Sequence, residues 1–279
     1  MLPISVCMIV KNEEKNIENC LQRLSRHPFE IVVVDTGSTD KTKELVKKYA
    51  DKLLDFLWCD DFSKARNFSI SQASNDWVLI IDCDEFVEEL DFTAIQKLMA
   101  EYPYAIGQLY RDNICYDKDH KPIHSYDYVE RLFDRRLYYY TGSIHEQVTS
   151  RDGSQLYGFE MPLTVKHTGY NGSKEELEAK AQRNIRLLLT ELQKDPKDPY
   201  LYYQLGESYM LKSDYENAYS YFDQGFYLDV DENLEYVQRM IISYGYSLLY
   251  TNRIEKALSL QNLSLIHISE PTRLGMISY

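Results

Sequence analysis

The sequence is short of basic charge and of long apolar runs. Its 31 Lys and Arg residues against 44 Asp and Glu residues give a net charge of −13. This deficit argues against a nucleic-acid binder that works by neutralising phosphates, and equally against a binder of anionic membrane surfaces. No apolar run approaches the roughly 20 residues that span a bilayer, so we expect no membrane span. The apolar run 4–10 lacks a basic residue before it and a cleavage site after it, so we expect no signal peptide.

Paired cysteines and glycine-rich nucleotide motifs are also missing. The five cysteines form no Cys-x-x-Cys pair and are odd in number. That pattern excludes a disulfide scaffold and a cysteine zinc site, and it indicates reduced thiols in a cytoplasmic protein. Neither a GxGxxG nor a GxxxxGK[ST] motif occurs, which disfavours dinucleotide-binding and P-loop folds.

What is present is a series of short apolar runs in the first ninety residues. The runs 4–10, 31–34 and 77–81 are nearly continuous, as in strands buried on both faces. A helical spacing of apolar residues follows the first run, and a helix over 41–49 is expected after the second. The alternation predicts an α/β fold with a mostly parallel sheet and helices on both faces.

A polar cluster follows each of these strands, at the edge where open sheets bind ligands. The clusters are 11–14, Asp35 and the triplet from Asp82 to Asp84. Positions two apart on a strand point the same way, so Asp82 and Asp84 suit Mg²⁺ or Mn²⁺ that also holds substrate phosphate. The alternatives are a surface tripeptide and, for Asp35, a cap of the next helix.

Four blocks in the first ninety residues carry a family resemblance. VCMIVKNEE, EIVVVDTGSTDKT, DFSKARN and WVLIIDCDE occur in the order and spacing of the family-2 inverting glycosyltransferases with the GT-A fold. Further on, RLFDRR, GSIHEQV and VKHTGY resemble the subgroup with tetratricopeptide repeats, which includes peptide S- and O-glycosyltransferases. The resemblance implies a GT-A domain over residues 1–170 and a nucleoside-diphosphate sugar donor, most often uridine-linked.

The resemblance also implies a set of donor-binding residues, namely Val10, Asn12, Glu13, Asp35, Arg66, Asn67, Asp82 and Arg131. Asp35 would hydrogen-bond the base, Asp82 would lie near the ribose, and Arg131 would neutralise the leaving phosphate. For Arg131 an ion pair with Glu130 or Asp134 is the alternative.

The resemblance further implies a divalent cation, Mg²⁺ or Mn²⁺. Its expected ligands are Asp84, Asp82 and His167. His167 matches a position that some of these enzymes use for a metal or diphosphate contact. The alternative for His167 is a hydrogen-bonded histidine at a domain boundary.

Inverting transfer also needs a general base facing the acceptor. Family members often use an Asp in an ED pair, which this sequence lacks. It offers His145 and Glu146 instead, and we expect Glu146 to act as the base with His145 positioning it or contacting substrate. The alternative is that both are polar loop residues flanking the site.

From Ser173 the pattern becomes helical, and the region 171–262 predicts a helical linker and tetratricopeptide-like repeats. Tyr202 to Tyr209 followed by Ala218 and Phe222 fits the 34-residue repeat, with Gly225 where two helices approach. Gly245 continues the pattern 39 residues after Gly206. Such repeats suit an acceptor peptide or a protein partner.

The last residues, 263–279, look foreign to this pattern. LSLIHISEPTR resembles a translated sequencing adapter, and Pro271 forbids an ordinary helix. We therefore expect a non-native tail and a natural chain that continues past about residue 262.

Taken together, the residues predict a metal-assisted inverting glycosyltransferase acting on a peptide Cys or Ser or on a glycan. The main alternative is a tetratricopeptide-type scaffold whose glycosyltransferase-like domain is inactive. A sugar nucleotidyltransferase is disfavoured, because residues 11–14 contain no glycine.

Overall fold

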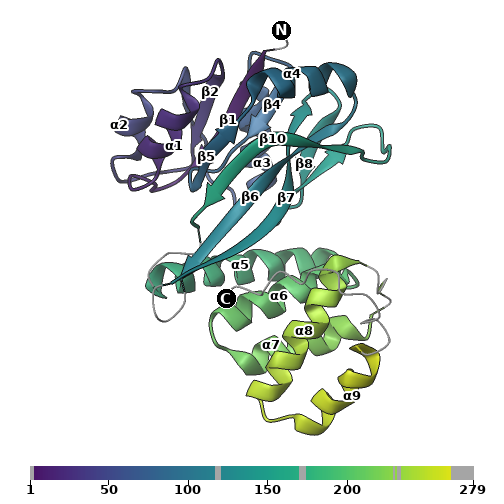
Figure 1. Ribbon diagram of the computed structural model, residues 1–279. Helices are drawn as coiled ribbons and strands as arrows, with labels where there is room; N and C mark the ends of the chain where they lie inside the picture. Colours follow the sequence, from purple (N-terminus) through teal and green to yellow (C-terminus); the bar gives the residue numbers. More distant parts are fainter. Residues whose placement is uncertain (1–2, 117–120, 170–173, 229, 231–233, 265–279) are drawn as a thin grey trace. The chain divides into compact units, whose positions relative to one another are not determined.

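The chain forms two compact units that divide after Asn171. The computed structural model in Figure 1 describes residues 3–116, 121–169, 174–228, 230 and 234–264. The first unit contains a large sheet flanked by helices, and the described residues of the second form helices and no strands.

Eight strands make up the main sheet of the first unit, in the order β3-β2-β1-β4-β7-β6-β10-β5. Their bounds are β1 (Ile4–Val10), β2 (Glu30–Asp35), β3 (Lys52–Asp55), β4 (Trp77–Ile80), β5 (Glu85–Leu90), β6 (Ile106–Tyr116), β7 (Pro122–Asp134) and β10 (Gly158–His167). The remaining strands, β8 (Tyr138–Thr141) and β9 (Gln147–Ser150), pair with each other in a separate ribbon.

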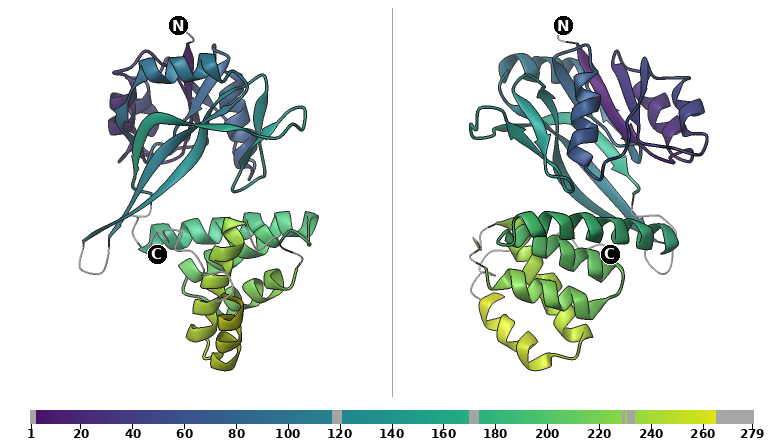
Figure 2. Two further views of the ribbon diagram at one scale, coloured as in Figure 1. Left: turned by 45° about the vertical axis from the view of Figure 1, so that its right-hand side comes forward. Right: turned by 180° about the vertical axis from the view of Figure 1, so that it is seen from behind.

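Six of the eight strands run in the same direction, so the expectation of a mostly parallel sheet is confirmed, and β7 and β5 run against them. Strands β3, β2, β1 and β4 are parallel, as their apolar sequences predict. Beyond β4, however, β7 is antiparallel to both β4 and β6, and β5 is antiparallel to β10. The strands β6 and β7 follow each other directly in the chain and form a long hairpin, which requires antiparallel pairing (Figure 2).

Helices cover both faces of this sheet, as expected. The face with α1 (Ile17–Leu24), α2 (Thr42–Val46) and α4 (Phe92–Glu101) contains the larger core cluster. The opposite face is covered by α3 (Phe62–Ser71), seen in front of the sheet in the right-hand view of Figure 2, and by the ribbon of β8 and β9. Helix α2 is shorter than the predicted 41–49.

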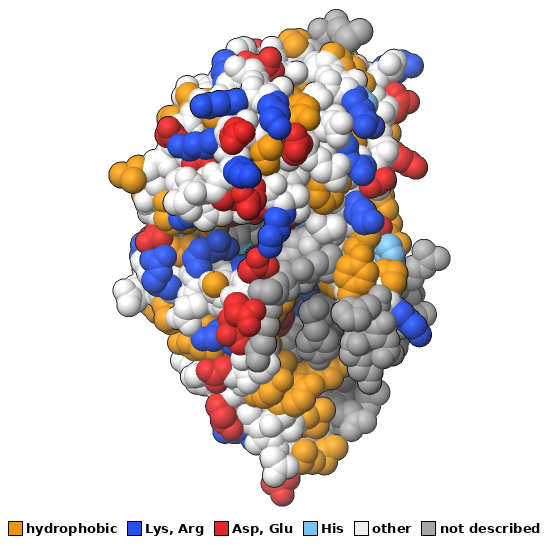
Figure 3. Space-filling view, turned by 90° about the vertical axis from the view of Figure 1, so that its left-hand side faces the viewer, with side chains coloured by type: hydrophobic (Ala, Val, Ile, Leu, Met, Phe, Trp, Pro, Cys, Tyr) orange, Lys and Arg blue, Asp and Glu red, His pale blue; other side chains and the backbone are white. Residues whose placement is uncertain are grey.

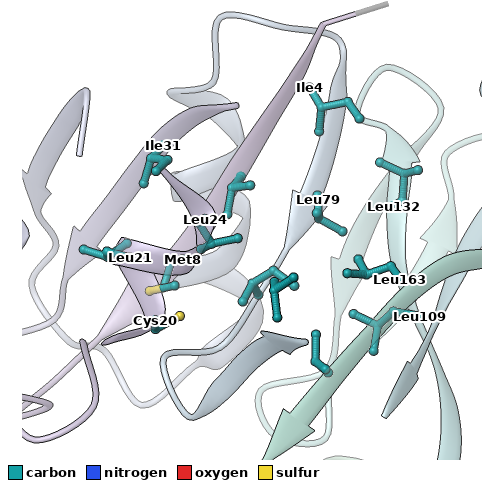
Figure 4. Close-up of a cluster of buried hydrophobic side chains, with 14 of the residues drawn as sticks. Ile4, Met8, Cys20, Leu21, Leu24, Ile31, Leu79, Leu109, Leu132 and Leu163 are labelled. Carbon is teal, nitrogen blue, oxygen red and sulfur yellow. The ribbon is translucent and has the colours of Figure 1, made fainter. Parts of the chain in front are cut away.

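The larger core cluster explains why the first strands form where they do. Side chains at alternate positions of β1, such as Met8, meet the apolar stripe of α1, including Leu21 and Leu24 (Figure 4). Leu79 of β4 and Leu163 of β10 continue the cluster across the sheet. Burying such a side chain contributes about 1.5–3 kcal/mol, so this cluster fixes the strand register.

The order of the strands creates a place for a ligand. From β1 the chain moves outward to β2 and β3, and then returns to place β4 on the other side of β1. The connections that leave the carboxyl ends of β1 and β4 therefore run to opposite sides. Open α/β sheets bind ligands at such a point, where the strand order reverses.

The second unit contains α5 (Lys174–Lys194), α6 (Pro199–Leu211), α7 (Tyr215–Phe226), α8 (Glu235–Tyr250) and α9 (Ile254–Ser264). Its core joins α6, α7 and α8 through buried residues that include Tyr203, Phe222 and Tyr244. A Cβ on Gly225 would lie 2.6 Å from the Cβ of Tyr202, so the predicted close approach of two helices there is confirmed.

The expected foreign tail, residues 263–279, is described by the structure only at its start. Helix α9 includes residues 263 and 264, which we expected outside any helix, and residues 265–279 lie outside the described part of the chain. Among the described helices, none is long and apolar enough to cross a membrane.

Candidate active site

Asp35 ends β2 with a fully buried carboxylate. Its Oδ1 accepts hydrogen bonds from the backbone N–H groups of Gly37 and Ser38, at 2.9 and 2.8 Å. Its Oδ2 is also buried and has no hydrogen-bond partner among the described residues. Asp35 therefore shapes the turn after β2 and does not cap α2, whose N-cap residue is Lys41. A buried acceptor without a donor is costly, so Oδ2 is suited to a ligand N–H.

The loop after β1 is fastened to the loop after β2. Asn12 has a left-handed backbone, with φ of 57°, and its Oδ1 accepts from the N–H of Thr39 at 2.8 Å. Glu13 donates its N–H to the hydroxyl of Thr42, and burial raises the pKa of its carboxyl, with nearby Asp84 adding to the effect. The side chain of Val10, the last residue of β1, is buried in the larger core cluster.

Asp82 and Asp84 lie in the turn between β4 and β5, and not on the strand as alternation assumed. The turn is closed by a hydrogen bond from the N–H of Glu85 to the carbonyl of Asp82. As a result, the two carboxylates have different partners. Asp82 faces two arginines, whereas Asp84 Oδ2 lies 3.5 Å from Nε2 of His167.

The Asp82 carboxylate is held by Arg66 and Arg131. Arg66 donates to both oxygens at 2.9 and 3.2 Å, and Arg131 donates to Oδ2 at 2.9 Å. Burial acts to raise the pKa of Asp82, but the two guanidinium groups outweigh it and hold that pKa well below its usual range. Arg131 also donates to Glu85, so its partners are Asp82 and Glu85 and neither of the two expected from sequence, Glu130 and Asp134.

Arg66 joins this cluster to Glu146. Its Nε donates to Glu146 Oε1, and both side chains are largely buried. The Arg66 guanidinium also lies over the ring of Tyr140, 5.7 Å from its centroid. His145, by contrast, is exposed and has a positive φ of 51°. The predicted base is thus near Asp82, connected through one arginine.

Asn67 fixes the position of the ribbon that leads to Glu146. Its Nδ2 donates to the carbonyl of Tyr140 and its Oδ1 accepts from the N–H of Tyr140, at 2.8 and 2.9 Å. Both ends of the Asn67 amide therefore bond the backbone of β8, on the element adjoining the site.

The polar network continues through residues that the sequence analysis did not single out: Glu85, Arg111, Asn113 and Asp127. Glu85 is 1% exposed and accepts from Arg131 at 2.9 Å. Arg111 donates to Asp127 at 2.9 and 2.6 Å, and Asp127 accepts from Asn113 at 3.1 Å. In the sequence, Arg111 and Asn113 occupy alternate positions of β6, which places both side chains on one face of the sheet, and the strand register brings Asp127 of β7 opposite Arg111.

His167, at the end of β10, completes the network. Its Nδ1 lies 2.7 Å from Asn113 Oδ1, and its Nε2 faces Asp84. The described residues contain no group of three or more His, Cys, Asp or Glu side chains arranged for a metal. They do bring together the oxygen of Asp84 and the nitrogen of His167, and a Cβ on Gly169 would overlap both atoms. Gly169 therefore keeps open the space beside them.

The surface around this unit carries charges of both signs. On the face in Figure 3, Lys and Arg side chains lie among Asp and Glu side chains. That distribution agrees with the argument from composition against a phosphate-backbone binder on this face.

Comparison with known proteins assigns the family. The profile described as "Glycosyl transferase family 2" matches residues 5–154, more than half of the chain. The chain belongs to this family. The family predicted from the four sequence blocks is thus confirmed, and the matched region contains every site residue described above except His167 and Gly169.

Two curated relatives match this chain over more than half of their own length. A TPR repeat-containing protein of Synechococcus elongatus is 29% identical over 243 residues, covering 81% of this chain and 57% of the relative. The SPbeta prophage-derived glycosyltransferase SunS of Bacillus subtilis is 29% identical over 233 residues, covering 77% and 51%. This chain therefore spans just over half the length of these relatives.

Among solved structures, the S. aureus TarS 1–349 complex with UDP-GlcNAc is similar to this chain with a TM-score of 0.46 and 14% identity. The match covers 89% of this chain and 81% of that one.

Proposed function

We propose that this chain transfers a sugar from a nucleoside-diphosphate donor, with uridine as the base, to a peptide Cys or Ser or to a glycan. The transfer is a single inverting displacement at the anomeric carbon. The observation that carries the proposal is the set of groups gathered where β1, β2 and β4 end: the unpartnered Asp35 Oδ2, the arginine-bound Asp82, and the pair of Asp84 and His167.

Donor binding begins at Asp35. Its Oδ2 accepts the N3–H of uracil, which supplies the donor that this buried oxygen lacks within the described residues. Asn12 and Glu13, on the loop fastened against the β2 turn, border the nucleoside. Asp82, kept ionised by two arginines, accepts from the ribose hydroxyls. The bonds of Arg131 to Asp82 and Glu85 favour a role in orienting Asp82 over direct contact with the leaving phosphate.

The residues that would hold Mg²⁺ or Mn²⁺ are Asp84 and His167. The fit is supported by the facing oxygen and nitrogen, and by the space that Gly169 keeps beside them. One or two protein ligands together with substrate phosphates are typical for such cations. When bound, the cation stabilises negative charge on the leaving diphosphate. Asp82, whose oxygens accept hydrogen bonds from two arginines, is proposed to contact the ribose, and Asp84 and His167 the cation.

Glu146 is proposed as the general base. It takes the proton from the acceptor hydroxyl or thiol as the new bond to the anomeric carbon forms, and the nucleoside diphosphate leaves with the old bond's electrons. Arg66 orients its carboxylate, and the exposed His145 beside it is proposed to contact the acceptor.

The helical unit is proposed to recognise the acceptor or a protein partner. The close packing of α6 against α7 at Gly225 and the TPR repeat-containing relative support an interpretation of this unit as tetratricopeptide-like repeats. Repeats of this kind stack into extended surfaces that bind peptides.

The test is calorimetric titration with a panel of nucleotides and nucleotide sugars, with and without Mn²⁺. We expect uridine diphosphate species to bind, and to bind more tightly with Mn²⁺. Asp84→Asn should abolish the Mn²⁺ effect and lower turnover about 100-fold. Asp76→Asn, which removes an exposed carboxylate of the same unit, should change neither. A folded wild-type protein that binds no nucleotide would contradict the proposal and favour the inactive scaffold.

A further inference from the structure

A chain of hydrogen bonds runs from Arg111 through Asp127 and Asn113 to His167. Arg111 can only donate, and this determines which atom is the donor at each further step. Arg111 donates from Nε and from a terminal nitrogen to the two oxygens of Asp127, at 2.9 and 2.6 Å. Burial acts to raise the pKa of Asp127, but the hydrogen bonds from Arg111 hold that pKa below its usual value. Asp127 is therefore a carboxylate, which accepts hydrogen bonds and donates none.

An acceptor-only Asp127 determines how the Asn113 amide is oriented. The Asn113 side-chain atom 3.1 Å from Asp127 Oδ1 has to be the donor Nδ2, so the amide oxygen points the other way. That oxygen lies 2.7 Å from Nδ1 of His167. Because a carbonyl oxygen only accepts, Nδ1 of His167 has to carry the hydrogen.

The tautomer of His167 follows from this orientation. A histidine that ligates a metal is neutral, so with the hydrogen on Nδ1 the ligating atom is Nε2, which faces Asp84 Oδ2 at 3.5 Å. Both Asn113 and His167 are largely buried, so water competes little for these bonds.

We propose that Asn113 is a positioning residue that sets the Nδ1–H tautomer of His167 and so prepares Nε2, with Asp84, to bind a divalent cation. Asp127 and Arg111 act behind it by fixing the amide orientation. This inference rests on the proposed function, because that proposal assigns the cation to Asp84 and His167. It adds that three residues of β6 and β7, none of which touches the cation, determine the affinity for it.

The first experiment observes the tautomer without metal or substrate. Nitrogen-15 NMR of the histidine rings in the wild-type protein, with His167 assigned from the spectrum of His167→Gln, should show hydrogen on Nδ1. In Asn113→Leu, which is similar in size but cannot accept, the His167 signals should move toward the Nε2–H form. A wild-type ring with hydrogen on Nε2, or on both nitrogens, would overturn the inference.

The second experiment measures Mn²⁺ binding by electron paramagnetic resonance in the presence of UDP. Asn113→Leu should weaken Mn²⁺ binding roughly 10–100-fold, as loss of a partner behind a metal ligand typically does. The matched control is Asp112→Asn, the neighbouring position on β6, whose side chain bonds His124 on the other face of the sheet. It should leave Mn²⁺ affinity unchanged.

The outcomes separate the two proposals. If wild-type protein binds no Mn²⁺ with UDP, the assigned cation site fails, whatever the NMR spectrum shows. If wild-type protein binds Mn²⁺ and folded Asn113→Leu binds it equally well, the cation site stands and the role of Asn113 is overturned. Should Asn113→Leu not fold, Asn113→Ser, which is too short to bridge His167 and Asp127, serves in the same comparison.

Discussion

At the residue scale, Asp35 offers the sharpest test of donor recognition. Because Oδ1 is held by the N–H groups of Gly37 and Ser38, the amide oxygen of an Asp35→Asn variant has to take that place. The amide nitrogen then replaces Oδ2, and a buried acceptor becomes a donor. Uracil presents N3–H and cytosine presents an N3 lone pair. Asp35→Asn should therefore lose UDP affinity by about 10–100-fold, equivalent to 1–3 kcal/mol, and gain affinity for CDP.

The control for this prediction removes a similar charge nearby. Asp55 pairs with the same Lys43 that lies near Asp35, but its side chain is 76% exposed. Asp55→Asn should leave both nucleotide affinities unchanged in calorimetric titrations. If Asp35→Asn weakened UDP and CDP equally, Asp35 would be a structural residue of the turn and not a contact to the base.

Substitution of Glu146 by glutamine distinguishes a role as general base from a role in holding the site together. Glu146→Gln keeps the size of the side chain and a hydrogen-bonding oxygen for Arg66, but it removes the basic group. We expect turnover to fall by about 10²–10⁴-fold while donor affinity stays within a few-fold, because the base acts on the acceptor. Glu130→Gln, on the exposed side of β7, should behave as wild type. A large loss of UDP affinity in Glu146→Gln would instead show that its ion pair holds the donor site together.

The sequence predicted which single residues would gather, but not their partners. Asp35, Asp82 and Asp84 were found because each follows a buried strand. The pairing of Asp82 with Arg66 and Arg131 was not, since these three residues are brought together by elements far apart in the chain. Glu85 and Asn113 were missed for the same reason, because a buried polar side chain looks like an exposed one until its partner strand is known.

At the scale of elements, the strands that could be predicted from the sequence are those buried on both faces of the sheet. The strand 4–10 was predicted with its observed bounds, because a strand covered on both faces is apolar throughout. Strands β6 and β7 carry polar and apolar side chains on both faces, and no expectation covered them. The segment from Asp82 to Asp84 was predicted to alternate like a strand, but it forms a turn. The apolar run before it does not indicate at which residue the hydrogen bonding between strands ends.

Two glycines of the helical unit test its packing. A Cβ on Gly225 in α7 would lie 2.6 Å from the Cβ of Tyr202, whereas one on Gly245 in α8 has nothing within 4 Å. Gly225→Ala should lower the free energy of unfolding by about 1–3 kcal/mol through overpacking. Gly245→Ala should raise it by about 0.5–1 kcal/mol, since alanine favours a helix over glycine. Urea denaturation of both variants measures this, and equal effects would contradict the packing at Gly225.

At the scale of the whole molecule, the two units have separate cores. The two clusters of the first unit contain only residues up to Val165, and the cluster of the second contains only residues from Tyr200 onward. All proposed donor and cation residues belong to the first unit. The proposed donor binding therefore belongs to the first unit, and the proposed acceptor recognition belongs to the second.

A fragment of residues 1–171 tests this division of labour. It retains both of its core clusters and every proposed donor residue, so it should unfold cooperatively and bind UDP within about threefold of the full chain, a difference under 1 kcal/mol. Because the proposed acceptor surface is gone, transfer to a peptide should be lost while slow hydrolysis of the bound nucleotide sugar persists. Circular dichroism, calorimetry and mass spectrometry of a peptide acceptor measure the three properties. A folded fragment that still glycosylates the peptide at the full rate would remove the helical unit from acceptor recognition, and tenfold weaker UDP binding would mean that the donor site needs it.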